Sequence, residues 1–416
     1  MANSDRERER RPVRNFIVAV LGLTLAGLIF VAGVATGASL DVAGTVGFFP
    51  PSALPVPAAG VPDEETADEF KVFWEVWNTI EDRFYYDLPD RRTRIYGAIN
   101  GMLETLDDPY TAFVPPEVAR ILREDNSGEF EGIGAYVEEA PDGGVFIIRV
   151  FEDGPAAQAG LRAGDIVVAV DGQDITRATL NEALLLIRGP AGTDVTLTVV
   201  REGEDQLLEF TITRARLEIP TVEARMLDDN IGYVALFEFN SVASRRLTDA
   251  VEELLDQGAE AIILDLRNNP GGFLDQAIDV ADLFLPEGVV VIQRDVDGNE
   301  RIHRSRDGQI AEDVPLVVLV NEGSASASEI VAGAIQDRGR GTLIGETTFG
   351  KGSVQLQFDL SDGSQLRVTY ANWYTPNDRS ISEEGITPDI IVETPTEPSE
   401  EDPQLERAIQ YLETGQ

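Results

Sequence analysis

The stretch Ala261-Ile-Ile-Leu-Asp-Leu-Arg-Asn-Asn-Pro-Gly-Gly-Phe273 joins a nearly continuous apolar run to a glycine pair and a second apolar segment. Such a run is typical of a strand that is buried on both faces of a sheet. Further apolar runs and segments of helical spacing alternate along the chain, at 232–236, 244–257, 273–285, 314–320 and 326–336. This alternation predicts an α/β layer in which helices cover both faces of the sheet.

Two of the predicted strands are followed by residues that could take part in catalysis. In such sheets, reactive groups lie beyond the carboxyl ends of the strands. Gly271 and Gly272 follow one strand and expose backbone N–H groups before a helix. The other strand leads into Asn321-Glu-Gly-Ser-Ala-Ser-Ala-Ser-Glu-Ile330, a turn of small residues at a helix start. Serines at such positions usually cap the helix, although the helix dipole also favours a developing alkoxide there.

A lysine between two glycines stands in Thr347-Thr-Phe-Gly-Lys-Gly-Ser-Val-Gln355, and the strand that follows places Lys351, Ser353 and Gln355 on one face. The segment from Gly345 also fits the first seven positions of the phosphate-binding loop G-x-x-x-x-G-K-[ST]. The eighth position is a glycine, and the next segment alternates like a strand, where that loop requires a helix. We therefore interpret Lys351 as a general base, with nucleotide binding as the weaker alternative.

The composition removes several other chemistries. The 416 residues include one histidine and no cysteine, which excludes disulfides, thiol nucleophiles and multi-histidine zinc sites, so we expect no metal and no cofactor. The one imidazole, His303, lies in a polar stretch that we predict to be a solvated loop, which leaves a carboxylate or lysine as the base. The formal net charge of −41 argues against nucleic acid, because phosphate binding needs clustered Lys and Arg.

The N-terminus has the pattern of a membrane segment. Residues 1–14 contain five arginines, and residues 15–40 carry no charge and are long enough to span a bilayer. The basic side predicts a cytoplasmic N-terminus and an extracytoplasmic body, with the chain anchored in the cell membrane by one span. A cleaved signal peptide and secretion are the alternative, although signal cores are usually shorter. The proline-rich residues 41–66 are predicted to be a spacer.

Residues 67–126 are predicted to be helical. The first helix has apolar residues at three- and four-residue spacing, namely Phe70, Phe73, Trp77, Ile80 and Phe84. Packing against the core is the favoured interpretation, and self-association of two copies through Phe70 to Phe84 is the alternative. A second helix is expected over 92–105. At the other end, residues 393–416 form an acidic tail with a short helix over 404–412.

Residues 127–217 consist of short alternating stretches separated by glycine-rich turns. With Asp153-Gly-Pro-Ala-Ala-Gln-Ala-Gly-Leu161 and the strand 166–170, they resemble a PDZ domain of the bacterial protease type. A peptide would then add as a strand beside Tyr136–Glu138, against a helix over 180–187 and with its last side chain in an apolar pocket. Backbone N–H groups before that strand would receive the terminal carboxylate, at Gly132, Ile133, Gly134 and Ala135.

Taken together, residues 70 to 392 resemble the carboxyl-terminal processing (tail-specific) proteases, serine peptidases with a Ser–Lys dyad and an embedded PDZ domain. The motifs that carry this resemblance are Leu264–Gly272, Ser324–Glu329, Gly345–Gln355 and Gly385-Ile-Thr-Pro-Asp389. The resemblance implies a mixed α/β multidomain fold whose core, residues 218–392, is of the ClpP/crotonase-like type.

The resemblance also implies residue roles. Ser326 would be the nucleophile, Lys351 the general base and Gln355 its support. The oxyanion hole would be formed by the backbone N–H groups of Gly272 and Ala327. The family usually has glycine where this chain has Asp378, which puts the local turn in doubt. The alternative function is a membrane-tethered PDZ adaptor with an inactive protease domain.

This mechanism places physical demands on the site. A lysine of ordinary pKa is protonated at pH 7, and lowering its pKa by about 3 units takes roughly 4 kcal/mol, which desolvation can supply. We therefore predict that Lys351 is buried, that Gln355 orients it by a hydrogen bond, and that no unscreened carboxylate contacts it. The implied partners are proteins with free, often apolar C-termini. Arg188, at the end of the groove helix, either relays peptide binding to the catalytic face or is a surface residue.

Overall fold

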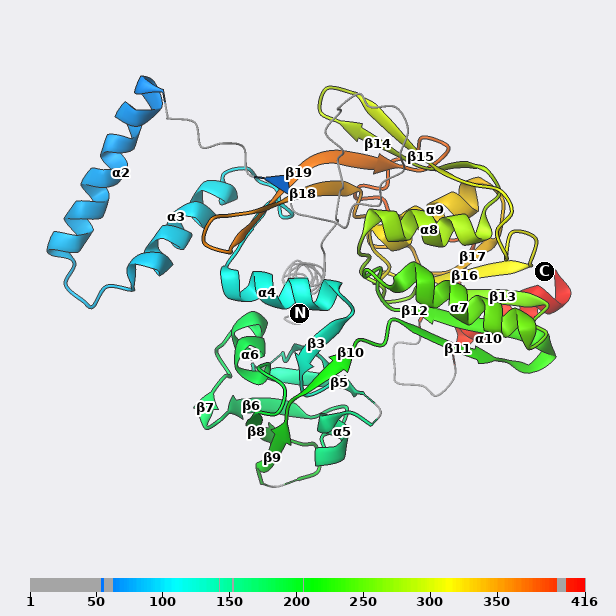
Figure 1. Cartoon of the computed structure of the whole chain (residues 1–416), viewed down its shortest axis with the longest axis horizontal. Coiled ribbons are helices and arrows are strands. Elements are labelled where there is room, and N and C mark those ends of the chain that lie inside the picture. Colours follow the sequence, from blue (N-terminus) through cyan, green and yellow to red (C-terminus); the bar gives the residue numbers. More distant parts are fainter. Residues whose placement is uncertain are drawn as a thin grey trace, which may run out of the picture.

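The computed structural model describes residues 54–55, 63–141, 143–151, 153–204, 206–394 and 402–415. Within them the chain forms N-terminal helices, a small β-rich domain and a larger α/β core (Figure 1). The predicted cytoplasmic segment, the apolar segment 15–40 and most of the spacer lie outside the described residues. None of the described helices combines the length and the apolar character needed to cross a membrane.

The core contains a six-stranded sheet in the order β11-β12-β13-β16-β17-β20. Its strands are β11 (Val222–Met226), β12 (Ile231–Leu236), β13 (Ala261–Asp265), β16 (Leu316–Val320), β17 (Thr342–Gly345) and β20 (Ile390–Ile391). Strand β11 is antiparallel to β12, and every other neighbouring pair is parallel. The apolar strands and the intervening helices expected from the sequence are therefore confirmed, and the carboxyl ends of the parallel strands meet at one edge.

Helices cover both faces of this sheet. On one face lie α7 (Ala243–Asp256), α8 (Leu274–Phe284) and α9 (Ala327–Asp337), packed on side chains such as Val234 and Leu264. On the other face, the next side chains along the same strands, such as Ala235 and Ile263, pack against the C-terminal helix α10 (Pro403–Thr414). The sequence predicts this last helix without a role, and the structure shows that it buries the second face of the sheet.

A second sheet contains Gln355 in a strand that begins two residues after Lys351. Its strands are β1 (Leu54–Pro55), β18 (Ser353–Asp359), β19 (Gln365–Tyr374), β14 (Gly288–Asp295) and β15 (Glu300–Ser305), with β2 (Ala112–Val114) beside β19. The prediction of a solvated loop around His303 is wrong, because this residue lies in β15 and packs edge-on against Trp373. Burial lowers the pKa of His303 to about 4, so its imidazole is neutral at pH 7.

The N-terminal helices are α2 (Glu64–Arg83), α3 (Arg91–Glu104) and α4 (Pro116–Asn126). The favoured prediction that the first helix packs into the core is wrong, because no residue of α2 is buried. Phe70 and Trp74 are 52% and 54% exposed, and Figure 1 shows α2 projecting from the rest of the chain. Helical spacing identifies an apolar face but does not say what covers it. Self-association through this helix stays a prediction.

The β-rich domain has its own hydrophobic core. It consists of β4 (Ala135–Glu139), β5 (Val145–Val150), β6 (Ile166–Val170), β7 (Gln173–Asp174), β8 (Asp194–Val200) and β9 (Leu208–Thr213), with helices α5 (Pro155–Ala159) and α6 (Leu180–Ile187). These elements confirm the strands and the groove helix predicted from the sequence. A two-stranded connection, β3 (Glu129–Gly132) with β10 (Ala215–Glu218), joins the domain to the core.

Candidate active site

The loops that follow β13 and β16 are joined by hydrogen bonds at the carboxyl edge of the sheet. Ser324 Oγ donates to the carbonyl of Leu266 at 2.8 Å, and Ser328 Oγ donates to the carbonyl of Asn269 at 2.9 Å. The Asn269 amide in turn donates to the carbonyl of Leu236 at the end of β12. Two of the three alternating serines therefore hold the loops together, and Ser326 lies between them.

Ser326 occupies a strained backbone position between β16 and α9. Its φ of 54° and ψ of −105° are unusual for a residue with a side chain, and it is the N-cap residue of α9. A sharp turn of this kind presents a side chain at the start of a helix, where the helix dipole favours negative charge. The side chain is buried, with 2% of the residue exposed.

The buried carboxylate of Glu329 joins the serine turn to the lysine loop. Its Oε2 accepts the backbone N–H of Ser326 at 2.7 Å and that of Lys351 at 2.8 Å. Its Oε1 accepts the hydroxyl of Thr348 and the N–H of Gly350, both at 2.6 Å. Because one oxygen receives both N–H groups, the nitrogens of Ser326 and Lys351 lie no farther apart than the sum of those two distances. The sequence motifs alone do not indicate this role of Glu329.

Lys351 is 3% exposed, which confirms its predicted burial. Burial, helped by the charge of the buried Arg367 guanidinium, lowers its pKa to about 7. Glu329 and Asp108 act in the opposite direction, but hydrogen-bond donors hold both carboxylates. The Lys351 ammonium also lies 4.7 Å from the ring centre of Tyr110, a contact that favours its charged form. Desolvation is the largest of these effects, so a substantial fraction of Lys351 is neutral at pH 7.

Gln355 stands on β18, two residues after Ser353. Its amide donates to Ser353 Oγ at 2.9 Å and to Thr369 Oγ1 at 3.1 Å. These bonds fix the amide beside the lysine strand, because Thr369 is the partner of Gln355 across the β18–β19 pair. The hydrogen bond from Gln355 to Lys351 stays a prediction.

Gly272 and Ala327, the candidate oxyanion donors, lie on the two joined loops. Gly272 has a φ of 149°, and a Cβ atom there would lie 2.3 Å from the carbonyl oxygen of Phe239. Phe239 pairs through its backbone with the neighbours of Gly272, donating to Gly271 and accepting from Phe273. Within the described part of the chain, neither the Gly272 N–H nor the Ala327 N–H has an acceptor. Both donors are thus available to a ligand.

The Gly385-Ile-Thr-Pro-Asp389 motif supports the lysine loop from outside. The Ile386 N–H donates to Thr348 Oγ1, which itself donates to Glu329. Asp378, the departure from the family pattern, adopts a positive φ of 60° and accepts from Arg294 at 2.8 Å. Asp378 thus adopts a backbone conformation that glycine favours, and aspartate tolerates this region better than most residues.

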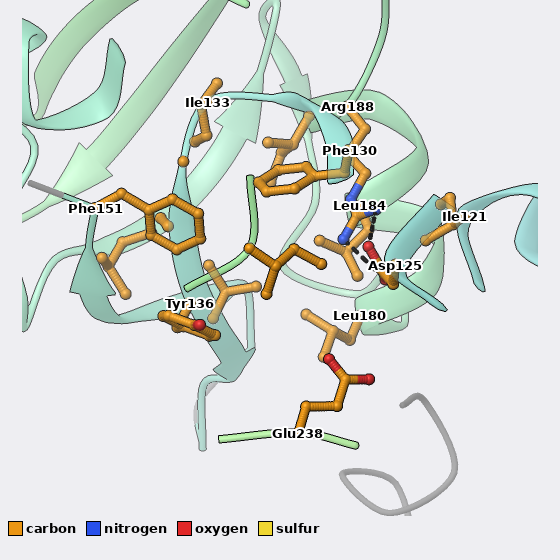
Figure 2. A pocket seen from close by; sticks show the side chains of 16 residues that line it. Ile121, Asp125, Phe130, Ile133, Tyr136, Phe151, Leu180, Leu184, Arg188 and Glu238 are labelled. Carbon is orange, nitrogen blue, oxygen red and sulfur yellow. Dashed lines mark hydrogen bonds and ion pairs between the residues drawn. The ribbon is translucent and has the colours of Figure 1, made fainter. Parts of the chain in front are cut away.

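The groove between β4 and α6 contains a pocket of about 140 Å³ (Figure 2). Ile133, Gly134 and Ala135 line it as the sequence predicts, whereas Gly132 is placed in β3, opposite Ala215. Helix α4 closes one side, where Asp125 receives two hydrogen bonds from Arg188, at 2.7 and 3.1 Å. Arg188 is thus a partly buried residue of the groove wall and not a surface residue.

Arg367 gives a direct test of the electrostatics around Lys351. Arg367 is 7% exposed, and removing its charge in Arg367→Met should raise the pKa of Lys351. If the neutral lysine serves as the base, the acidic limb of the pH–rate profile should move to higher pH. Activity at pH 7 should fall by up to about tenfold, the effect of one pKa unit. Arg367→Lys, which keeps the charge, should retain the wild-type profile, and an unshifted limb in Arg367→Met would contradict the argument.

Comparisons with known proteins agree with this arrangement. A model of peptidase family S41 matches residues 230–392, a PDZ domain model matches 146–201, and a model of the activating protease CtpB N-terminal domain matches 53–117. Fold and matched models define a serine peptidase that carries a PDZ domain.

The relatives make the assignment more specific. The carboxy-terminal-processing protease of Bartonella bacilliformis is 40% identical over 338 residues, which cover 80% of this chain and 77% of the relative. The carboxyl-terminal-processing protease of Synechocystis sp. is also 40% identical, and the match covers 77% of this chain and 76% of the Synechocystis protein. A solved photosystem II D1 C-terminal processing protease is 33% identical with a TM-score of 0.53, covering 77% of this chain and 86% of that one. The chain belongs to the carboxyl-terminal-processing protease family.

Proposed function

We propose that this peptidase cleaves proteins through a dyad of Ser326 and Lys351, without ATP. The observation that carries the proposal is the Glu329 carboxylate, one oxygen of which binds the backbone of both residues. The lowered pKa of Lys351 supports its role as a base, since an ordinary lysine would be charged. The segment after Lys351 is strand β18, which does not fit the helix of a phosphate-binding loop.

The proposed reaction has two steps. Neutral Lys351 takes the proton of the Ser326 hydroxyl while the oxygen attacks the scissile carbonyl, and the N–H groups of Gly272 and Ala327 stabilise the oxyanion. Collapse of the tetrahedral intermediate breaks the C–N bond, and protonated Lys351 returns a proton to the leaving amine. A water molecule then hydrolyses the acyl-enzyme, with Lys351 again serving as the base.

We further propose that the PDZ domain recognises the free, often apolar C-terminus of the substrate. The apolar lining of the groove and the backbone of Ile133 to Ala135 support this mode of binding. The chain would be anchored in the cell membrane by residues 15–40, with its catalytic body outside the cytoplasm. This location rests on the sequence pattern alone.

The test is a processing assay with a protein that ends in an apolar C-terminus. We expect the full chain to cleave this protein without ATP. A matched protein whose last residue is charged and amidated should be cleaved much more slowly. Cleavage that requires ATP would contradict the proposal. Binding without any cleavage would instead favour an inactive PDZ adaptor, for which nothing in the site gives support.

The groove and the catalytic loops are adjacent, which suggests a route for control through Arg188. Glu238 lines the groove, and the next residue, Phe239, pairs with the residues on either side of Gly272. Arg188→Ala should free Asp125 and lower turnover by about tenfold, while a C-terminal peptide still binds the full chain. Arg162→Ala, at an exposed site of the same domain, is the control. Loss of peptide binding with no separate effect on turnover would contradict gating.

A further inference from the structure

One carboxyl group in the groove has no hydrogen-bond partner among the residues that the structure describes. Glu238 follows β12, is 8% exposed, and directs its carboxyl into the pocket beside Leu180 (Figure 2). Across the described ranges, burial and the charges of Asp125 and Arg188 act on this carboxyl, and no hydrogen bond to it is found. Burial raises its pKa to about 8, with a further contribution from nearby Asp125. A buried polar group of this kind is costly unless a ligand satisfies it.

The position of Glu238 along the groove indicates which part of a peptide it meets. Figure 2 places Ile133 and Arg188 at one end of the pocket, and Leu180 and Glu238 at the other. A peptide whose carboxylate binds near Ile133 would run antiparallel to β4, so its upstream residues pass Glu238. Alternate side chains of a strand point the same way, so the last and third-last side chains both face the pocket.

The charges around Glu238 determine which side chain would suit it. Arg188 is the nearby cation, and it is already paired with Asp125 in two hydrogen bonds. Arg149 lies over the ring of Tyr136. Burial raises the pKa of Tyr136 to about 12, so its phenol is neutral. Because Arg188 is paired with Asp125, an ionised Glu238 would add an uncompensated negative charge to a pocket with apolar walls. A cation supplied by the ligand would compensate it.

We propose that Glu238 is a specificity-determining residue that selects substrates with lysine or arginine at the third position from the C-terminus. The peptide cation and the carboxylate of Glu238 form an ion pair, and the carboxyl proton is released to solvent. An apolar side chain at that position leaves the carboxyl of Glu238 without a partner, which weakens binding of such a peptide. The site therefore distinguishes the two kinds of peptide both by this cost and by its attraction for a cation. This inference rests on the proposed recognition of C-termini by the groove.

The test measures peptide binding to the full chain carrying Ser326→Ala, which prevents cleavage. Fluorescent hexapeptides with the same apolar last residue differ only in lysine or norleucine at the third-last position. We expect the lysine peptide to bind about tenfold more tightly. Glu238→Gln should remove most of this preference, and Glu238→Leu should reverse it in favour of norleucine. Glu139→Gln, at an exposed carboxylate of β4, should leave the preference unchanged.

The outcomes separate this inference from the proposed function. Equal binding of both peptides to the Ser326→Ala chain would overturn the role of Glu238 and leave C-terminal recognition intact. An unchanged preference in both Glu238 variants would do the same. Failure of every peptide, including one with an apolar C-terminus and norleucine, would overturn the proposed recognition itself.

Discussion

Replacing either Ser326 or Lys351 by alanine is expected to lower the rate of processing by at least about 10⁴-fold. Without the serine there is no acyl acceptor, and without the lysine the serine keeps its proton at neutral pH. In the proposed dyad the two residues act as one unit, so the double variant should be hardly slower than either single variant. The measurement is the rate of product formation from a substrate with an apolar C-terminus.

A matched control is available for the lysine. Lys71 on the exposed helix α2 is the only other lysine of the sequence, and Lys71→Ala should retain wild-type activity. Substantial processing by folded Lys351→Ala would show that another group is the base. Substantial processing by Ser326→Ala would show that the nucleophile lies elsewhere.

Replacing Glu329 by alanine should have the largest effect on stability. Four donors lose their acceptor inside the protein, and each unsatisfied donor costs about 1–3 kcal/mol. Relaxation and water entry reduce the sum, so we expect the free energy of unfolding to fall by about 3–5 kcal/mol. Processing should be lost as well, because the same carboxylate holds the backbones of Ser326 and Lys351 together.

Two further variants make this prediction specific. Glu329→Gln keeps the shape but only one acceptor oxygen, so its stability should lie between those of the wild type and Glu329→Ala. Glu322→Gln, at an exposed carboxylate of the same turn, should change neither stability nor activity. Denaturant unfolding gives the free energies, and a fully stable Glu329→Ala would contradict the role of this carboxylate.

The sequence predicts the core well because its signals there are local. A strand buried on both faces leaves a continuous apolar run, as in 261–266, whatever its partners are. Ser326 and Lys351 can be proposed from the sequence because each stands in a distinctive glycine- or serine-rich motif that resembles the family's. Their burial and the separate hydrogen bonds of Ser324 and Ser328 agree with the choice of the middle serine.

Residues whose roles depend on tertiary pairing could not be predicted in the same way. The spacing of Ser326 and Glu329 is the signature of a capping box, which accounts for one of the bonds of Glu329. The other three donors come from residues 348–351, brought there by the pairing of β16 with β17. Arg367 reads as an ordinary strand residue, and only the β18–β19 pair brings it near Lys351.

The two wrong predictions have a common origin. The amphipathic pattern of α2 and the polar pattern around His303 both describe the character of a face, and neither identifies what packs against it. Along α2, Arg94 of α3 lies over Trp77, but most of the apolar face is left uncovered by the described residues, and Phe70 and Phe84 stay exposed. In β15 the charged side chains of Glu300, Arg301 and Arg304 are exposed, whereas His303 packs on Trp373.

The central claim is that buried Lys351 activates Ser326, and the rate of covalent labelling by a fluorophosphonate at different pH values tests it most directly. Mass spectrometry of the digested chain identifies the labelled residue. Loss of a proton from Lys351 creates the active form, so labelling should occur at Ser326 and its rate should rise through pH about 7, then level off. Labelling at another serine, or a rate that rises only near pH 10 as for an ordinary lysine, would contradict the claim.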